Sequence, residues 1–134
     1  MNNFELFHHN PLEWQLVNDG VSSNNTTDEN TLSYELKTFV CEGQYHQALE
    51  RILTGFLQHA NASEVPAAWI SGFYGSGKSH LVKILRYLWN NHQLSSGAAA
   101  RSLSTLPDEL SDLLTELTTM GTRQGGLQAI GGTL

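Results

Sequence analysis

The chain has 134 residues, the size of about one domain. Hydrophobic residues make up 40% and charged residues 15%, which indicates a globular chain and excludes a disordered one. The formal net charge of −6 argues against direct nucleic-acid binding, and no apolar run approaches the ~20 residues of a membrane span. The single cysteine, Cys41, excludes an internal disulfide framework. With no signal-peptide pattern, we expect a cytoplasmic protein.

The first thirty residues predict a strand followed by a polar loop. Apolar and polar residues alternate from Leu12 to Leu16, which is the pattern of a half-buried strand. The run 22–31 has no apolar residue and is typical of a surface loop. Residues 1–30 are therefore taken as an N-terminal strand and polar loop.

Residues 31–62 predict a helical segment that packs on the core. Apolar residues recur at helical spacing over about 31–41, and Gly43 is a stop signal. A second helix over 44–60 has one broad apolar stripe, which we expect to face the core. The stripe consists of Tyr45, Ala48, Leu49, Ile52, Leu53, Phe56 and Leu57.

A phosphate-loop pattern lies in the middle of the chain. Residues 72–79, GFYGSGKS, satisfy G-x-x-x-x-G-K-[ST] without a substitution. The apolar run 67–71 before them predicts a short buried strand, and an amphipathic pattern after Lys78 predicts a helix. Strand, loop and helix follow one another in the order that this motif requires.

Each residue type of the motif has a physical role. Glycines let the backbone take positive φ angles, so that its N–H groups can point at a polyphosphate. The start of the following helix adds unpaired N–H groups. We expect Lys78 to bridge the β and γ phosphates and the Ser79 hydroxyl to be a ligand of Mg²⁺. The predicted nucleotide site comprises Gly72, Phe73, Tyr74, Gly75, Ser76, Gly77, Lys78, Ser79 and His80.

Downstream of the loop the sequence predicts two helices. In the first, we expect Lys83 and Arg86 to form a solvated stripe and not a nucleic-acid contact. In the second, Thr105 and Asp108 predict a capping box, and leucines at helical spacing continue to Gly121. Residues 127–130 predict one short strand.

The expected fold class is α/β: an incomplete P-loop NTPase core, a parallel sheet with flanking helices, preceded by the N-terminal strand and helical segment. Residues 63–134 would form the N-terminal part of that NTPase domain. No carboxylate after the loop follows a buried apolar strand, so no catalytic residue is assigned. Only 55 residues follow Ser79, too few for several βαβ units, so the domain looks truncated and this chain alone is not expected to hydrolyse ATP.

The block Trp69–His80, WISGFYGSGKSH, resembles the start of the large P-loop ATPases of bacterial phage-defence (BREX) systems, of the BrxC/PglY type. Residues 36–40 and the helix containing 49–53 add to this resemblance, which covers most of residues 31–132 but only the first part of such a protein. It implies ATP with Mg²⁺ as cofactors, and other defence-system proteins as partners. The acidic catalytic residues of that family have no counterpart here.

Two alternatives stay open from the sequence. A P-loop kinase would need an arginine-rich lid after the loop, but only Arg101 and Arg123 follow Arg86. An interaction or regulatory module would use the nucleotide to stabilise its fold, without turnover. The choice between adenine and guanine and the oligomeric state are also left open.

Overall fold

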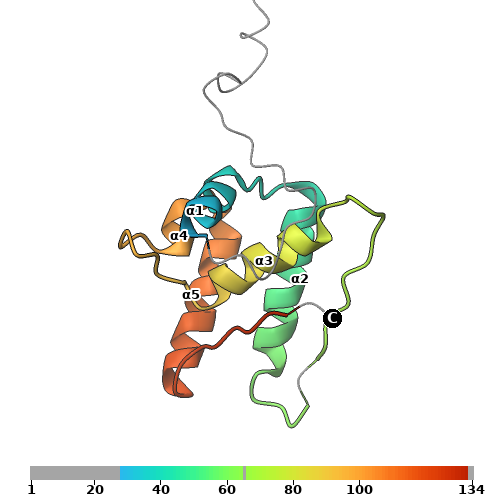
Figure 1. Cartoon of the computed structure of the whole chain (residues 1–134). Coiled ribbons are helices and arrows are strands. Elements are labelled where there is room, and N and C mark those ends of the chain that lie inside the picture. Colours follow the sequence, from blue (N-terminus) through green and yellow to red (C-terminus); the bar gives the residue numbers. More distant parts are fainter. Residues whose placement is uncertain (1–27, 65, 133–134) are drawn as a thin grey trace, which may run out of the picture.

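The computed structural model describes residues 28–64 and 66–132. Figure 1 shows helices that cross and pack on one another, with a long arm leaving them between α2 and α3. The predicted strand over 12–16 and nearly all of the 1–30 segment lie outside the described residues. The helices are α1 (Glu29–Thr38), α2 (Gly43–His59), α3 (Lys78–Trp89), α4 (Ala100–Leu103) and α5 (Asp108–Arg123).

The predicted α/β fold with a parallel sheet is wrong for the described part of the chain. Helices account for 57% of it, and it contains no strand or sheet. Its β pairing is limited to an isolated antiparallel bridge between Gln93 and Ala99. A buried strand needs paired neighbours on both sides. Within the described residues, the neighbouring elements are helices that pack on each other, so a buried strand would have no strand to pair with.

The run 67–71 shows this difference most clearly, since it was predicted to be a buried strand. It is extended but not paired, and the Trp69 side chain is 92% exposed. Together with Pro66 it borders a groove of about 440 Å³, whose other wall is α2, with Ile52 and Phe56. The run therefore lies between α2 and solvent and is not buried in a sheet.

The core is made largely of leucines from the four longer helices. The predicted stripe of α2 is confirmed except at Ile52, which lines the groove beside 67–71. Leu49 and Leu53 are each 1% exposed, and the other stripe residues are partly buried against the core: Tyr45, Ala48, Phe56 and Leu57. In α3, Ile84 and Leu88 are buried in the same way. The helix α2 packs mainly against α5. Burying one apolar stripe of each helix is the main source of the stability of such a bundle.

The helix boundaries follow the sequence only in part. The helix predicted over about 31–41 runs from Glu29 to Thr38, so it begins inside the predicted polar loop. The start of the last helix was also misplaced. The helix α5 begins at Asp108, after Pro107, and its N-cap makes no side-chain hydrogen bond. The predicted capping box between Thr105 and Asp108 is therefore wrong. Proline has no N–H and its φ suits the edge of a helix, so the chain turns into α5 at Pro107 and not at Thr105.

The short helix α4 was not predicted, and it carries the side chain that ties α3 to α5. The Arg101 guanidinium donates hydrogen bonds to the carbonyls of Leu88 (2.7 Å) and Trp89 (2.9 Å) at the end of α3. It also donates to the Leu114 carbonyl (2.9 Å) and the Thr118 hydroxyl (2.7 Å) of α5. Arg101 thus adds donors to the last carbonyls of α3 and joins them to the middle of α5.

The residues after α5 form no strand, so the predicted strand at 127–130 is also wrong. They run back across the helices in Figure 1. Leu127 packs against Gly121 so closely that a Cβ there would overlap it, and Gly131 lies beside the Arg86 side chain. Cys41 is buried, and burial raises the pKa of its thiol. In the described part, no helix is both long and apolar enough to span a membrane.

Candidate functional site

The phosphate-loop residues lie at the end of the exposed arm, where it enters α3. Gly75 and Gly77 both have φ of +77°, a left-handed conformation that side chains disfavour. The Ser76 N–H donates to the Phe73 carbonyl at 3.2 Å and closes a turn between them. The loop therefore has the tight, glycine-dependent backbone that the motif predicts.

The Lys78 ammonium lies inside this loop. Its Nζ donates to the carbonyls of Gly72 at 2.8 Å and Phe73 at 2.5 Å, and to the Ser76 hydroxyl at 3.3 Å. These partners lie two to six residues before Lys78, so its side chain folds back over the loop. The positive charge of Lys78 is thus held beside the Gly72 and Phe73 carbonyls of the loop.

The start of α3 adds unpaired N–H groups beside that charge. Its N-cap is Gly77, which offers no capping side chain, and its first turn has no acidic residue. The first intrahelical bond runs from the Leu81 N–H to the Gly77 carbonyl, 2.9 Å. The earlier N–H groups of α3 have no intrahelical partner, and with the helix dipole they favour an anion.

Ser79, the predicted Mg²⁺ ligand, lies on the exposed side of this first turn. Its hydroxyl is a hard oxygen donor of the kind Mg²⁺ takes, and at nucleotide sites one or two protein oxygens with phosphates and waters are enough. The residues present therefore fit the ion. Among the described residues, no three His, Cys, Asp or Glu side chains are grouped to hold a metal by themselves.

The helix α2 contacts the loop through Tyr45. Its hydroxyl donates to the Ser76 carbonyl at 2.9 Å, across 31 positions of sequence. Sequence reasoning placed Tyr45 only in the core stripe of α2. No spacing rule could have linked it to the loop, because the contact depends on how α2 and α3 cross.

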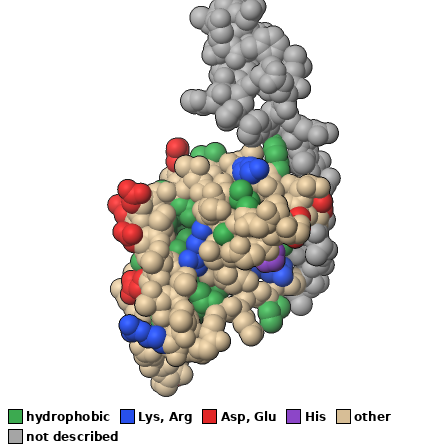
Figure 2. Space-filling view, turned by 90° about the vertical axis from the view of Figure 1, so that its left-hand side faces the viewer, with side chains coloured by type: hydrophobic (Ala, Val, Ile, Leu, Met, Phe, Trp, Pro, Cys, Tyr) green, Lys and Arg blue, Asp and Glu red, His purple; other side chains and the backbone are tan. Residues whose placement is uncertain are grey.

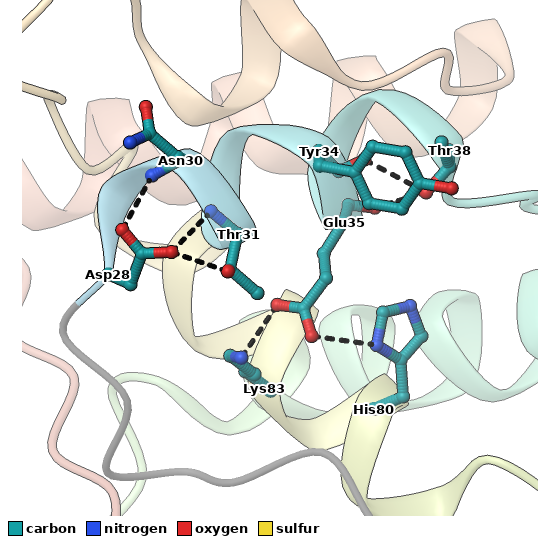
Figure 3. A network of polar contacts seen from close by, with 8 residues as sticks. All are labelled: Asp28, Asn30, Thr31, Tyr34, Glu35, Thr38, His80 and Lys83. Atoms are coloured by element: carbon teal, nitrogen blue, oxygen red, sulfur yellow. Dashed lines mark hydrogen bonds and ion pairs between the residues drawn. The ribbon is translucent and has the colours of Figure 1, made fainter. Parts of the chain in front are cut away.

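His80, included in the predicted site, turns toward α1 instead. Its Nδ1 lies 4.0 Å from Glu35 Oε1, and the Lys83 Nζ lies 2.6 Å from Glu35 Oε2 (Figure 3). Burial lowers the pKa of His80; the Glu35 carboxylate opposes this shift and the Lys83 charge adds to it. The His80 side chain therefore points away from the loop, while its backbone N–H stays among the unpaired groups at the start of α3.

Lys83 was predicted to lie on a solvated stripe, and this is wrong. It is only 2% exposed and its ammonium pairs with Glu35. A buried lysine needs such a partner, because an isolated charge is costly to remove from water. The pair joins α1 to α3 one turn after the phosphate loop.

Several described carboxylates have structural partners away from the loop. Asp28 caps α1, and Glu29 accepts from the Ser95 N–H at 3.0 Å. Glu109 lies 3.4 Å from the His46 Nε2. Arg101, one of the two arginines considered for a kinase lid, is occupied with the carbonyls of α3 and α5. Each of these four groups therefore has a structural partner.

The two aromatic residues of the loop, Phe73 and Tyr74, are 91% and 94% exposed. They make the loop accessible and mark it as a projecting, partly apolar feature. On the face seen in Figure 2, acidic side chains gather along one edge, and basic ones are separated by other surface.

No family model matches the sequence, and no solved structure shows significant similarity to this one.

Proposed function

We propose that the loop 72–79 and the start of α3 bind the triphosphate of ATP together with Mg²⁺. The observation that carries this proposal is the Lys78 ammonium, which lies inside a glycine loop directly beside an uncapped helix N-terminus. The Lys78 charge then converges with the dipole and the unpaired first N–H groups of α3. Such convergence favours a multiply charged phosphate group.

The contacts of Lys78 suggest how the triphosphate would enter. The ammonium now donates to the carbonyls of Gly72 and Phe73. Hydrogen bonds from a charged donor to a charged acceptor are stronger than those to neutral carbonyls, so phosphate oxygens would replace these partners. The Ser79 hydroxyl would supply one oxygen ligand for the accompanying Mg²⁺.

The wider setting rests on the resemblance of Trp69–His80 to the phage-defence ATPases. Under this proposal the chain is the nucleotide-binding N-terminal part of such an ATPase and works with other defence-system proteins in the cytoplasm. A P-loop kinase fragment receives less support, because Arg101 is engaged between helices. The described residues contain no sheet, so the proposal for this chain is nucleotide binding without turnover.

Titration calorimetry with Mg·ATP tests the proposal on the wild type and on Lys78→Ala. A charge-assisted hydrogen bond is worth ~1.5–3 kcal/mol, so we expect a roughly 10- to 100-fold loss of affinity. Lys37→Ala is the matched control, because Lys37 lies exposed in the last turn of α1. Equal affinity in all three folded proteins would refute the assignment of Lys78.

The expectation of no turnover is tested by phosphate release from the same proteins. We expect no release above background, because no carboxylate is assigned to the Mg²⁺–water shell and no arginine to the γ-phosphate. Sustained release by the wild type that Lys78→Ala abolishes would show that a catalytic carboxylate has been missed. Asp108→Ala and Glu109→Ala would then be the first variants to assay.

A further inference from the structure

Tyr45 of α2 contacts the loop in two ways. Its hydroxyl donates to the Ser76 carbonyl at 2.9 Å. It also lies so close to Gly77 that a Cβ at that position would overlap the hydroxyl. Gly77 therefore has two reasons to be glycine: its φ of +77° and the space occupied by Tyr45.

The hydrogen bond to Ser76 also determines where the next N–H group points. The described chain has no cis peptide bond. In a trans peptide the C=O of one residue and the N–H of the next lie in one plane and point in opposite directions. Because the Ser76 carbonyl points at Tyr45 on α2, the Gly77 N–H must point away from α2. Tyr45 thus sets the orientation of a loop N–H group.

The Tyr45 ring is itself held by the core. It lies against Phe39, with ring centroids 6.0 Å apart, and Phe39 lies 5.9 Å from the His80 ring of α3. Phe39 is 5% exposed and is the C-cap of α1. The ring is therefore placed by packing between α1, α2 and α3, and the hydroxyl transmits that placement to the loop.

We infer that Tyr45 is a positioning residue of the phosphate site, which orients the Gly77 N–H toward the bound phosphates. This inference rests on the proposed nucleotide binding and adds a residue outside the motif. The group that Tyr45 orients would contact phosphate and not the base. Loss of its hydroxyl should therefore weaken any triphosphate to the same extent.

The test compares Tyr45→Phe with Tyr87→Phe as the matched control, since Tyr87 is also partly buried against the core but lies near the end of α3, outside the loop. Affinities for Mg·ATP and for magnesium tripolyphosphate are measured well below the melting temperature, so that changes in stability do not enter. The loss of one hydrogen bond predicts a roughly 2- to 10-fold weaker affinity of Tyr45→Phe for both ligands. Tyr87→Phe should bind as the wild type does.

The amide ¹H and ¹⁵N shifts of Gly77 in the free protein give a readout that does not depend on a ligand. They should move in Tyr45→Phe and stay unchanged in Tyr87→Phe. If the wild type binds both ligands and Tyr45→Phe binds them equally well, the positioning role is refuted and nucleotide binding stands. A loss for ATP alone would also refute it, by indicating a base contact. Failure of the wild type to bind either ligand would overturn the proposed function and this inference with it.

Discussion

The starts of α1 and α3 are built in opposite ways. At α1, the Asp28 carboxylate accepts hydrogen bonds from the N–H groups of Asn30 (3.3 Å) and Thr31 (3.1 Å), and from the Thr31 hydroxyl (Figure 3). The acidic Glu29 follows in the first turn. At α3, the N-cap is a left-handed glycine and the first helical residue is Lys78. One start is satisfied within the chain, and the other is left without an internal anion.

The start of α1 therefore contributes stability, whereas the start of α3 is suited to binding. A capping side chain and an acidic first turn stabilise a helix, typically by about 1 kcal/mol for the cap. The start of α3 lacks both and adds a positive charge at the positive end of the dipole. That arrangement costs stability in the free protein and favours an external anion, which is the ligand class that we propose.

The largest effect is expected from Gly77→Ala, compared with Gly75→Ala. Both glycines have φ of +77°, but only a Cβ at Gly77 would meet Tyr45. The left-handed backbone costs ~1–2 kcal/mol in either variant. Displacing the Tyr45 hydroxyl adds the loss of its hydrogen bond, about 1 kcal/mol. Urea unfolding should show this difference, and equal losses would mean that Tyr45 yields without cost.

Removal of the cap at α1 should have the next largest effect. Asp28→Ala should lower the free energy of unfolding, because α1 loses the side chain that caps its first N–H groups. Affinity for Mg·ATP should not change, because Asp28 acts only on α1. Asn30→Ala is the control, since the cap uses only the backbone N–H of Asn30. A loss of affinity in folded Asp28→Ala would contradict the idea that the start of α1 serves stability and not binding.

A carboxylate placed at the start of α3 should give that helix start an internal anion, as at the start of α1. Ser79→Asp puts a negative charge in the first turn, where it is worth about 0.3–1 kcal/mol in stability. The same charge should repel phosphate, so the variant should melt higher and bind Mg·ATP more weakly than the wild type. Ser79→Asn, which adds no charge, is the control. A lower melting temperature in Ser79→Asp would contradict the idea of an unsatisfied helix start.

The smallest effect is a loss of stability in acid. The contributions from α3 and α1 should be lost in different pH ranges. Burial lowers the pKa of His80 in α3 from its ordinary 6.5, so the unfolded chain binds the proton more readily than the folded one. Stability is therefore lost as the pH falls below about 6.5 toward the lowered value. His80→Gln should remove this slope, as followed by thermal melts between pH 7 and 5. An unchanged slope would assign the titration to another group.

Asp28 responds to stronger acid. Hydrogen bonds from the Thr31 hydroxyl and backbone lower its pKa below its ordinary 3.8. Its contribution to stability is thus complete above that value and is lost as the pH falls through the lowered pKa. The slope that Asp28→Ala removes should therefore lie at lower pH than the slope that His80→Gln removes.

Local patterns were enough to place most helices. The apolar spacing of α2 predicted a helix over 44–60, and the structure has Gly43–His59. The predicted helix after the loop runs from Lys78 to Trp89. The glycine pattern of 72–79 indicated the positive φ angles at Gly75 and Gly77. These features depend on neighbours within a few residues, so the sequence alone contains the information.

Tertiary structure decided what could not be read from spacing. Whether 67–71 joins a sheet depends on partner strands elsewhere, and in the described part it lies between α2 and solvent. The burial of Lys83 depends on Glu35, which lies 48 positions earlier and reaches it only because α1 and α3 meet. The contact of Tyr45 with Ser76 likewise depends on how two helices cross. A single sequence shows which residues can form a helix or bind an anion, but burial and partnership are properties of the packed chain.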